Sequence, residues 1–145
     1  MLYEKKRTFG NIPIDLTDAA LAVDTPAYVG QSINAVQADA GTLDYEAENQ
    51  HFPEENTLEV IGWETATSAL EGATVKVALL SKSGDEGAEW KEELAFSIAQ
   101  AEIVKDQLIR RFTVPAQAAR HLQLAMTVGG EVFTAGKLLV LVRPL

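Results

Sequence analysis

The side chains that could act as acids, bases or metal ligands are few and scattered in this chain. His51 precedes Glu54 and Glu55 in the run HFPEEN, which combines one imidazole with two carboxylates, a set that metal ions can bind. No further ligand accompanies them, and the second histidine, His121, lies far away in the sequence. A solvated loop is the simpler interpretation of this run, so we expect no metal site and no cofactor.

Pairs of carboxylates are the other feature that could support catalysis. Asp85-Glu86 and Glu92-Glu93 are adjacent pairs, but a glycosidase needs two carboxylates facing each other across a cleft, about 5–9.5 Å apart. With 21 acidic residues in the chain, adjacent pairs are expected by number alone. The chain also has no cysteine, no nucleophile elbow G-x-S-x-G and no phosphate-binding glycine loop. No arrangement of catalytic side chains is therefore recognisable in the sequence.

Positive charge gathers at two places that could contact a partner. Lys5, Lys6 and Arg7 lie in a short N-terminal arm, which is either a solvated terminal strand or an arm that docks on an acidic neighbour. Arg110 and Arg111 follow each other in a predicted strand, which puts one guanidinium on each face of that strand. The arginine on the core side needs a carboxylate partner, either within the chain or across a subunit interface.

Two tryptophans complete the set of candidates. Trp63 and Trp90 fall at predicted strand positions, where a tryptophan is most often an anchor of a core or of an interface. Such rings can also serve as stacking platforms for sugars in carbohydrate-binding modules. The interface candidates that the sequence offers are Lys5, Lys6, Arg7, Trp90, Arg110 and Arg111.

The elements that must position these residues are mainly strands. Alternation of apolar and polar residues predicts strands at 57–63, 75–80, 89–98, 108–114 and 121–126, and a continuous apolar run predicts one covered on both faces at 138–142. Gly129-Gly130 marks a tight turn before the last of these, since glycine admits a positive φ. Short strands are expected at 27–29 and 42–45, a short helix capped by Asp15 and Asp18 at 19–23, and a helical turn or a loop at 99–105.

The 145 residues are expected to form a single domain, 1–145, with three parts. These are an N-terminal arm (1–10), a loop-rich acidic segment (11–56) and a region of regular strands (57–145). Residues 1–56 carry ten acidic and three basic side chains, a net charge of −7, whereas 57–145 carry eleven and nine, a net charge of −2. Short strands separated by turns predict an all-β fold: an antiparallel jelly roll or β-sandwich of about eight strands with a loop-rich N-terminal third.

Charge and hydropathy exclude several classes of partner. The net charge of −9 argues against nucleic acid, because phosphate binding depends on concentrated positive charge. The first ten residues lack the apolar stretch of a secretory signal. No apolar run approaches the roughly 20 residues of a membrane-spanning helix, so we expect no membrane partner.

Several short motifs in the C-terminal half are similar to a known family. They are Val75–Leu79, the polar loop at 83–86, Val114-Pro115, and the segments at 119–124, 127–130 and 133–136. With these motifs the chain resembles the capsid cement (decoration) proteins of tailed bacteriophages, of the jelly-roll type first associated with a Bordetella phage. Here His121 stands where that family commonly has an aromatic residue, and residues 11–56 match it poorly.

The resemblance implies a structural virion protein without catalytic activity, located on the outer surface of the capsid. Such a protein binds the assembled shell and ties neighbouring major capsid subunits together. The implied partners are the major capsid protein and further copies of this chain, as a homodimer or homotrimer. The alternative function is a glycan-binding jelly-roll adhesion module that uses Trp63 or Trp90, and exposure of these rings separates the two hypotheses. A small sandwich hydrolase ranks last, since no nucleophile and base are recognisable.

Overall fold

The computed structural model describes residues 9, 13–29, 43–44, 56–82, 87, 89–114 and 121–144, and strands dominate them. The elements are β1 (Ile14–Asp15), β2 (Ala27–Val29), β3 (Leu43–Asp44), β4 (Asn56–Ser68), β5 (Thr74–Lys82), β6 (Lys91–Ala99), the 3-10 helix η2 (Gln100–Glu102), β7 (Leu108–Thr113), β8 (His121–Gly129) and β9 (Phe133–Pro144). No α-helix forms in these parts of the chain. They therefore contain no helix with the length and apolar character that crossing a membrane requires. The predicted all-β class is confirmed.

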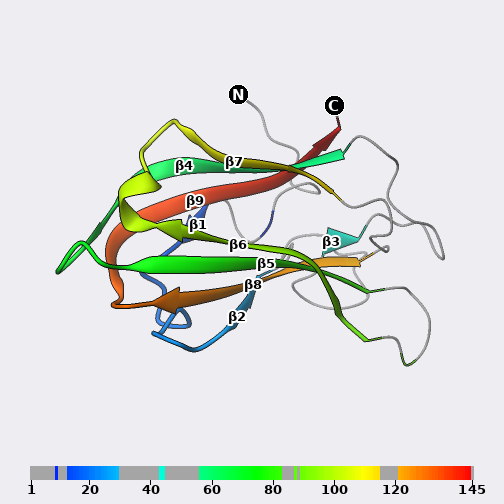
Figure 1. Ribbon diagram of the computed structural model, residues 1–145, viewed down its shortest axis with the longest axis horizontal. Coiled ribbons are helices and arrows are strands. Elements are labelled where there is room, and N and C mark those ends of the chain that lie inside the picture. Colours follow the sequence, from blue (N-terminus) through cyan, green and yellow to red (C-terminus); the bar gives the residue numbers. More distant parts are fainter. Residues whose placement is uncertain are drawn as a thin grey trace.

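The strands form two antiparallel sheets that pack face to face, with sheet A above sheet B in Figure 1. Sheet A has the order β1-β9-β4-β7, and sheet B has the order β2-β8-β5-β6, with β3 pairing to a further part of β8. Of the successive strands, β4 and β5, β6 and β7, β7 and β8, and β8 and β9 lie in opposite sheets. This exchange between sheets is the jelly-roll arrangement of two Greek keys. The prediction of an antiparallel jelly roll is therefore confirmed.

The core lies between the sheets because alternate residues of each strand point inward. In β5, Val75, Val77 and Leu79 are fully buried, while Lys76 between them is exposed. Burial of each such aliphatic side chain stabilises the fold by roughly 1.5–3 kcal/mol. In β9 all five residues of 138–142 are buried, so this run is covered on both faces, as its continuous apolar character predicted.

Strand β4 is longer than the seven residues predicted because it continues through a bulge after Gly62. The register with β9 shifts there, which leaves Trp63 as the extra residue. Gly62 Cα lies against the β6–β7 connection, where an added Cβ would stand 2.1 Å from the carbonyl oxygen of Val104. Two backbone hydrogen bonds fix the contact: Gly62 N donates to Gln107 O, and Asp106 N donates to Gly62 O, both at 2.8 Å.

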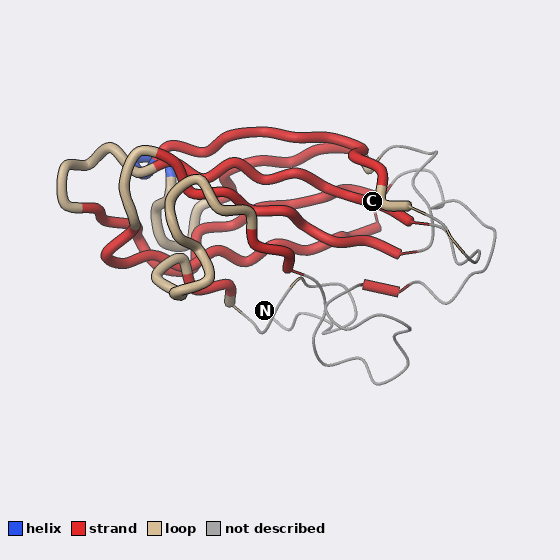
Figure 2. Tube along the Cα trace, turned by 90° about the horizontal axis from the view of Figure 1, so that it is seen from below, coloured by secondary structure: helices blue, strands red, loops and turns tan. Residues whose placement is uncertain are grey.

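Figure 2 shows that the described loops gather mainly at one end of the sandwich, where hydrogen bonds join them. In the β4–β5 turn, Leu70 N donates to Glu131 Oε1 of the β8–β9 turn at 2.7 Å. Gly130 has a φ of +78°, and an added Cβ there would lie 2.6 Å from Gly72 O. The two turns are thus held against each other, and glycine is needed at position 130 for both its conformation and its size.

The predicted helix at 19–23 is wrong. These residues form a turn and an isolated bridge from Val23 to β8. Asp15 accepts a hydrogen bond from Thr17 N at 2.9 Å, and Asp18 accepts one from Ala20 N at 2.9 Å. Each carboxylate therefore stabilises a local turn by binding the backbone amide two residues later. This turn competes with the use of the carboxylate as a helix cap.

The remaining local predictions differ from the structure mainly in their boundaries. The short strands appear as β2 and β3, and the segment at 99–105 contains the helical turn η2. Strand β9 begins at Phe133, so Thr134-Ala135-Gly136 lies inside the strand and not before it. Gly136 explains the difference. It has a φ of +135°, which lets β9 bend around Ala66 without ending.

Candidate interaction surfaces

The acidic groups in the described parts of the chain form no metal centre, and Glu92 and Glu93 do not face each other. No group of three or more metal-ligating side chains gathers there. Glu92 points outward from β6, whereas Glu93 occupies a bulge and accepts a hydrogen bond from Ser81 Oγ at 2.6 Å. The two are separated by the strand itself. His51, Glu54, Glu55, Asp85 and Glu86 lie outside the described residues.

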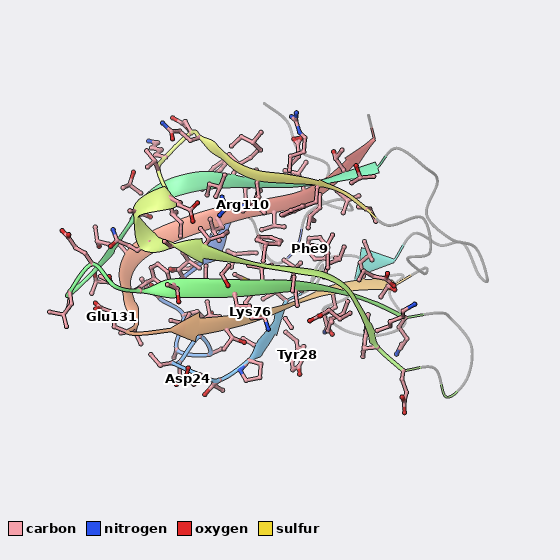
Figure 3. All side chains as sticks on the ribbon, viewed as in Figure 1. Phe9, Asp24, Tyr28, Lys76, Arg110 and Glu131 are labelled. Atoms are coloured by element: carbon pink, nitrogen blue, oxygen red, sulfur yellow. The ribbon has the colours of Figure 1, made fainter. Side chains whose placement is uncertain are left out.

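Arg110 closes one open side of the sandwich. It pairs with Val60 on the inner side of β7, the edge strand of sheet A, and its guanidinium reaches to sheet B (Figure 3). There it forms an ion pair with Glu102 at 2.8 Å and donates to the Ser97 carbonyl of β6 at 3.3 Å. The Ala99 amide and then Arg110 hold the pKa of the Glu102 carboxyl below its usual value. The partner of this arginine is thus within the chain.

Arg111 points to the outer side of sheet A, so the tandem arginines do lie on opposite faces. Its guanidinium is 3.5 Å from Glu59 on the neighbouring strand β4. The Glu59 side chain is only 3% exposed, whereas that of Arg111 is 56% exposed. A buried carboxylate is costly without a nearby cation, so Arg111 stabilises Glu59 and still presents its outer part to solvent.

Trp90 lies just before β6 and is half-buried. The Lys82 ammonium of β5 stands 5.1 Å from the centroid of its ring, a cation–π contact. Since Lys82 lies on the outer side of sheet B, this contact places Trp90 there too. Ser97, whose carbonyl accepts a hydrogen bond from Arg110, lies seven positions after Trp90, about 20 Å along β6. The structure therefore does not bring Trp90 and the arginines into one site.

Trp63 is 43% exposed at the bulge of β4, so neither tryptophan belongs to the buried core. Next to Trp63, Glu64 of β4 forms an ion pair with Lys137 of β9 at 3.7 Å. Lys5, Lys6 and Arg7, the other interface candidates, lie outside the described residues.

The sequence missed two surfaces that the structure makes evident. A groove of about 330 Å³ lies along β1 and β2, and its lining includes Ile14, Leu21, Asp18 and Tyr28. Tyr28 is 61% exposed, as alternation in β2 could have indicated, because Ala27 and Val29 on either side pack toward the core.

The second missed surface is the tip formed by the β4–β5 and β8–β9 turns. Leu70 is 85% exposed and Val132 is 52% exposed there. An aliphatic residue two positions from a glycine, in a turn between two strands, was the available sequence signal for this exposure.

No protein-family model matches the chain, and no curated protein sequence is significantly similar to it.

Proposed function

We propose that this chain is a structural virion protein that binds the outer surface of an assembled phage capsid. In this role it ties neighbouring major capsid subunits together and so stabilises the shell. It acts without a catalytic site or cofactor, and its partners are the major capsid protein and further copies of itself.

The observation that carries the proposal is where the resembling segments fall in the fold. The motif at 75–79 is the buried centre of β5, the motif at 121–124 begins β8, and 127–136 contains the β8–β9 turn and the start of β9. The shared residues are therefore those that build a jelly roll, a fold common among viral capsid and lectin domains.

The physical logic of such a protein fits the charge of this chain. A ligand that binds the assembled lattice better than free subunits stabilises the lattice by mass action. Several weak contacts held on one particle add through their effective concentration. With a net charge of −9, the chain would be repelled by packaged nucleic acid, which favours the outer surface.

Co-sedimentation with capsids of the source phage tests the proposal. We expect saturable binding at a fixed ratio to capsid subunits, and no binding to unassembled major capsid protein. Protein that stays in the supernatant at about 10 μM, where even a modest affinity gives binding, would contradict the proposal.

Within this proposal, the basic arm and the loops of the first third of the chain are the capsid contacts. Replacing Lys5, Lys6 and Arg7 together by alanine should weaken capsid binding, more so at low salt, because exposed charges interact over longer distances there. Equal binding by the parent and the triple variant would refute the placement of the contacts, though not capsid binding itself.

A glycan-binding module is the second candidate, and the exposure of Trp63 is the observation that favours it. A ring that is 43% exposed on a strand can stack against a sugar, whereas a buried ring could not. Titration with a glycan panel should then quench or shift the tryptophan emission of the parent protein but not that of Trp63→Phe. Emission that ignores every sugar would remove this candidate.

A further inference from the structure

The outer face of sheet B differs in character from the rest of the protein. Strand register assigns to it Tyr28, Thr74, Lys76, Ala78, Leu80, Lys82, Trp90, Glu92, Ala95, Ser97, Ala99, Gln123, Ala125, Thr127 and Gly129. One row crosses all four strands and consists of Tyr28, Ala125, Ala78 and Ala95. Most side chains are short, so another flat surface can approach this face closely.

The part of this face whose side chains the structure describes carries little negative charge. Its charged residues are Lys76, Lys82 and Glu92, which sum to +1, whereas the whole chain has a net charge of −9. The electrostatic repulsion between two copies of an acidic protein is smallest when faces of this kind contact each other. Lys76 has no ion-pair partner among the described side chains, although Glu92 of a facing copy could supply one.

Aromatic rings stand at two margins of the face. Figure 3 shows Tyr28 and Lys76 on the side of sheet B that lies away from Phe9 in the core. Tyr28 marks the β2 edge and is 61% exposed, and Trp90 lies beside β6 at the opposite edge under Lys82. Tyrosine and tryptophan are the residue types that most often anchor protein interfaces.

The size of the face fits a modest but specific contact. Strands β5, β6 and β8 have nine residues each and β2 has three. With about 4.8 Å between strands and roughly 3.3 Å per residue, the face covers about 500 Å². Two such faces together enclose on the order of 1,000 Å², the lower bound for specific interfaces.

We infer that the outer face of sheet B is the surface through which two copies of this chain pack about a two-fold axis. This inference assigns a surface to the self-association that belongs to the proposed function, and it rests on the proposed function only for that self-association. Such an axis runs near the centre of the alanine row, close to the half-buried Ala125, and the Tyr28 rings lie at the margins. A two-fold contact is self-complementary, so one patch serves both copies.

Sedimentation equilibrium of the full-length protein and of charge variants tests the inference. Ala125→Glu and Ala125→Lys each place like charges close to their own copies at the axis, while their mixture places opposite charges there. Leu70→Glu and Val132→Lys are the matched controls, since they make similar charge changes at exposed positions of the tip, away from the face. Thermal melts establish that each variant is folded.

The parent protein should move from 15.7 kDa toward twice that mass as its concentration rises to about 100 μM. Each Ala125 variant alone should dissociate at least about tenfold more readily, a change of about 1.4 kcal/mol, and the equimolar mixture should recover the dimer. The two controls should behave as the parent.

Three results would overturn the inference: a parent that stays monomeric over this range, an Ala125→Glu variant that dimerises normally, or a mixture without recovery. The measurement contains no capsid, so its failure leaves capsid binding to be decided by co-sedimentation. If Ala125→Glu dimerises like the parent but loses capsid binding, the face binds the capsid and not a second copy.

Discussion

Gly62 gives the sharpest prediction about how this fold is held together. It is the point where β4 meets the β6–β7 connection, and an added Cβ would lie 2.1 Å from Val104 O, 2.8 Å from Val104 C and 3.3 Å from Val104 N. These are backbone atoms, so no side-chain rotation relieves the clash. In Gly62→Ala the connection has to move away from β4 by about 1 Å or more, because nonbonded carbon and oxygen atoms do not approach so closely.

The displacement breaks specific interactions whose sizes can be summed. Gly62 N to Gln107 O and Asp106 N to Gly62 O are lost, at about 1 kcal/mol each. Ile103 of the same connection is fully buried, and loosening its packing costs about 1 kcal/mol more. We expect the free energy of unfolding to fall by about 3 kcal/mol, and the melting temperature to fall by about 10 °C for a chain of this size.

Urea denaturation followed by circular dichroism measures this loss. Gly72→Ala is the control, because the nearest atom to its added Cβ is Glu131 Oε2 at 3.5 Å, an ordinary contact, and its stability should change by less than about 0.5 kcal/mol. A Gly62→Ala variant as stable as Gly72→Ala would refute the close approach of the two segments.

Three further predictions address other parts of the structure. Phe9→Ala removes a ring that is 1% exposed, and urea denaturation should show a loss of about 3–5 kcal/mol; a loss below about 1 kcal/mol would contradict its place in the core. The lowered pKa of Glu102, caused by the Ala99 amide and Arg110, means that its contribution to stability is present above its unfolded-state pKa and lost as pH falls through its folded-state pKa. Between about pH 6 and pH 2 the melting temperature of the parent should therefore fall more than that of Glu102→Gln, and parallel curves would disprove the linkage. Leu70→Ser should leave the free energy of unfolding within about 0.5 kcal/mol of the parent, since Leu70 is 85% exposed; a larger loss in urea would mean that the side chain packs.

The strands of the second half could be predicted because each has one face in the core. In β5 and β8 the inward residues are apolar at every second position, and this periodicity is a direct consequence of strand geometry. The buried run at 138–142 could be predicted for the complementary reason, since only a strand covered on both sides tolerates apolar residues throughout. Such patterns depend on local sequence alone.

The errors arise where a contact distant in sequence decides the local conformation. The predicted strand ends at Trp63, yet β4 continues to Ser68, and the connection near Val104 fits against Gly62. In the strand predicted at 89–98, unbroken alternation would put Trp90 on the same face as Leu94 and Phe96, but the bulge at Glu93 moves it to the outer face. A single inserted residue reverses the faces of a strand, and no local pattern announces it.

The arginines show what the sequence could predict of a site. Their placement on opposite faces followed from alternation, and the need of the inner one for a carboxylate followed from the cost of burying a charge. The identity of the partners did not, because Glu102 and Glu59 come from a different connection and a different strand. The exposed Tyr28 and Leu70 were missed since apolar side chains are normally counted toward the core.

The measurement that tests the central claim most directly is the thermal stability of the assembled capsid with and without this protein. Capsids of the source phage are heated with increasing amounts of the purified chain, and their disassembly is followed by light scattering. A disassembly temperature that rises and then saturates at a fixed ratio of protein to capsid subunits is the result we predict, because binding only to the lattice shifts its equilibrium. A disassembly temperature that stays unchanged at about 100 μM protein would contradict the assignment.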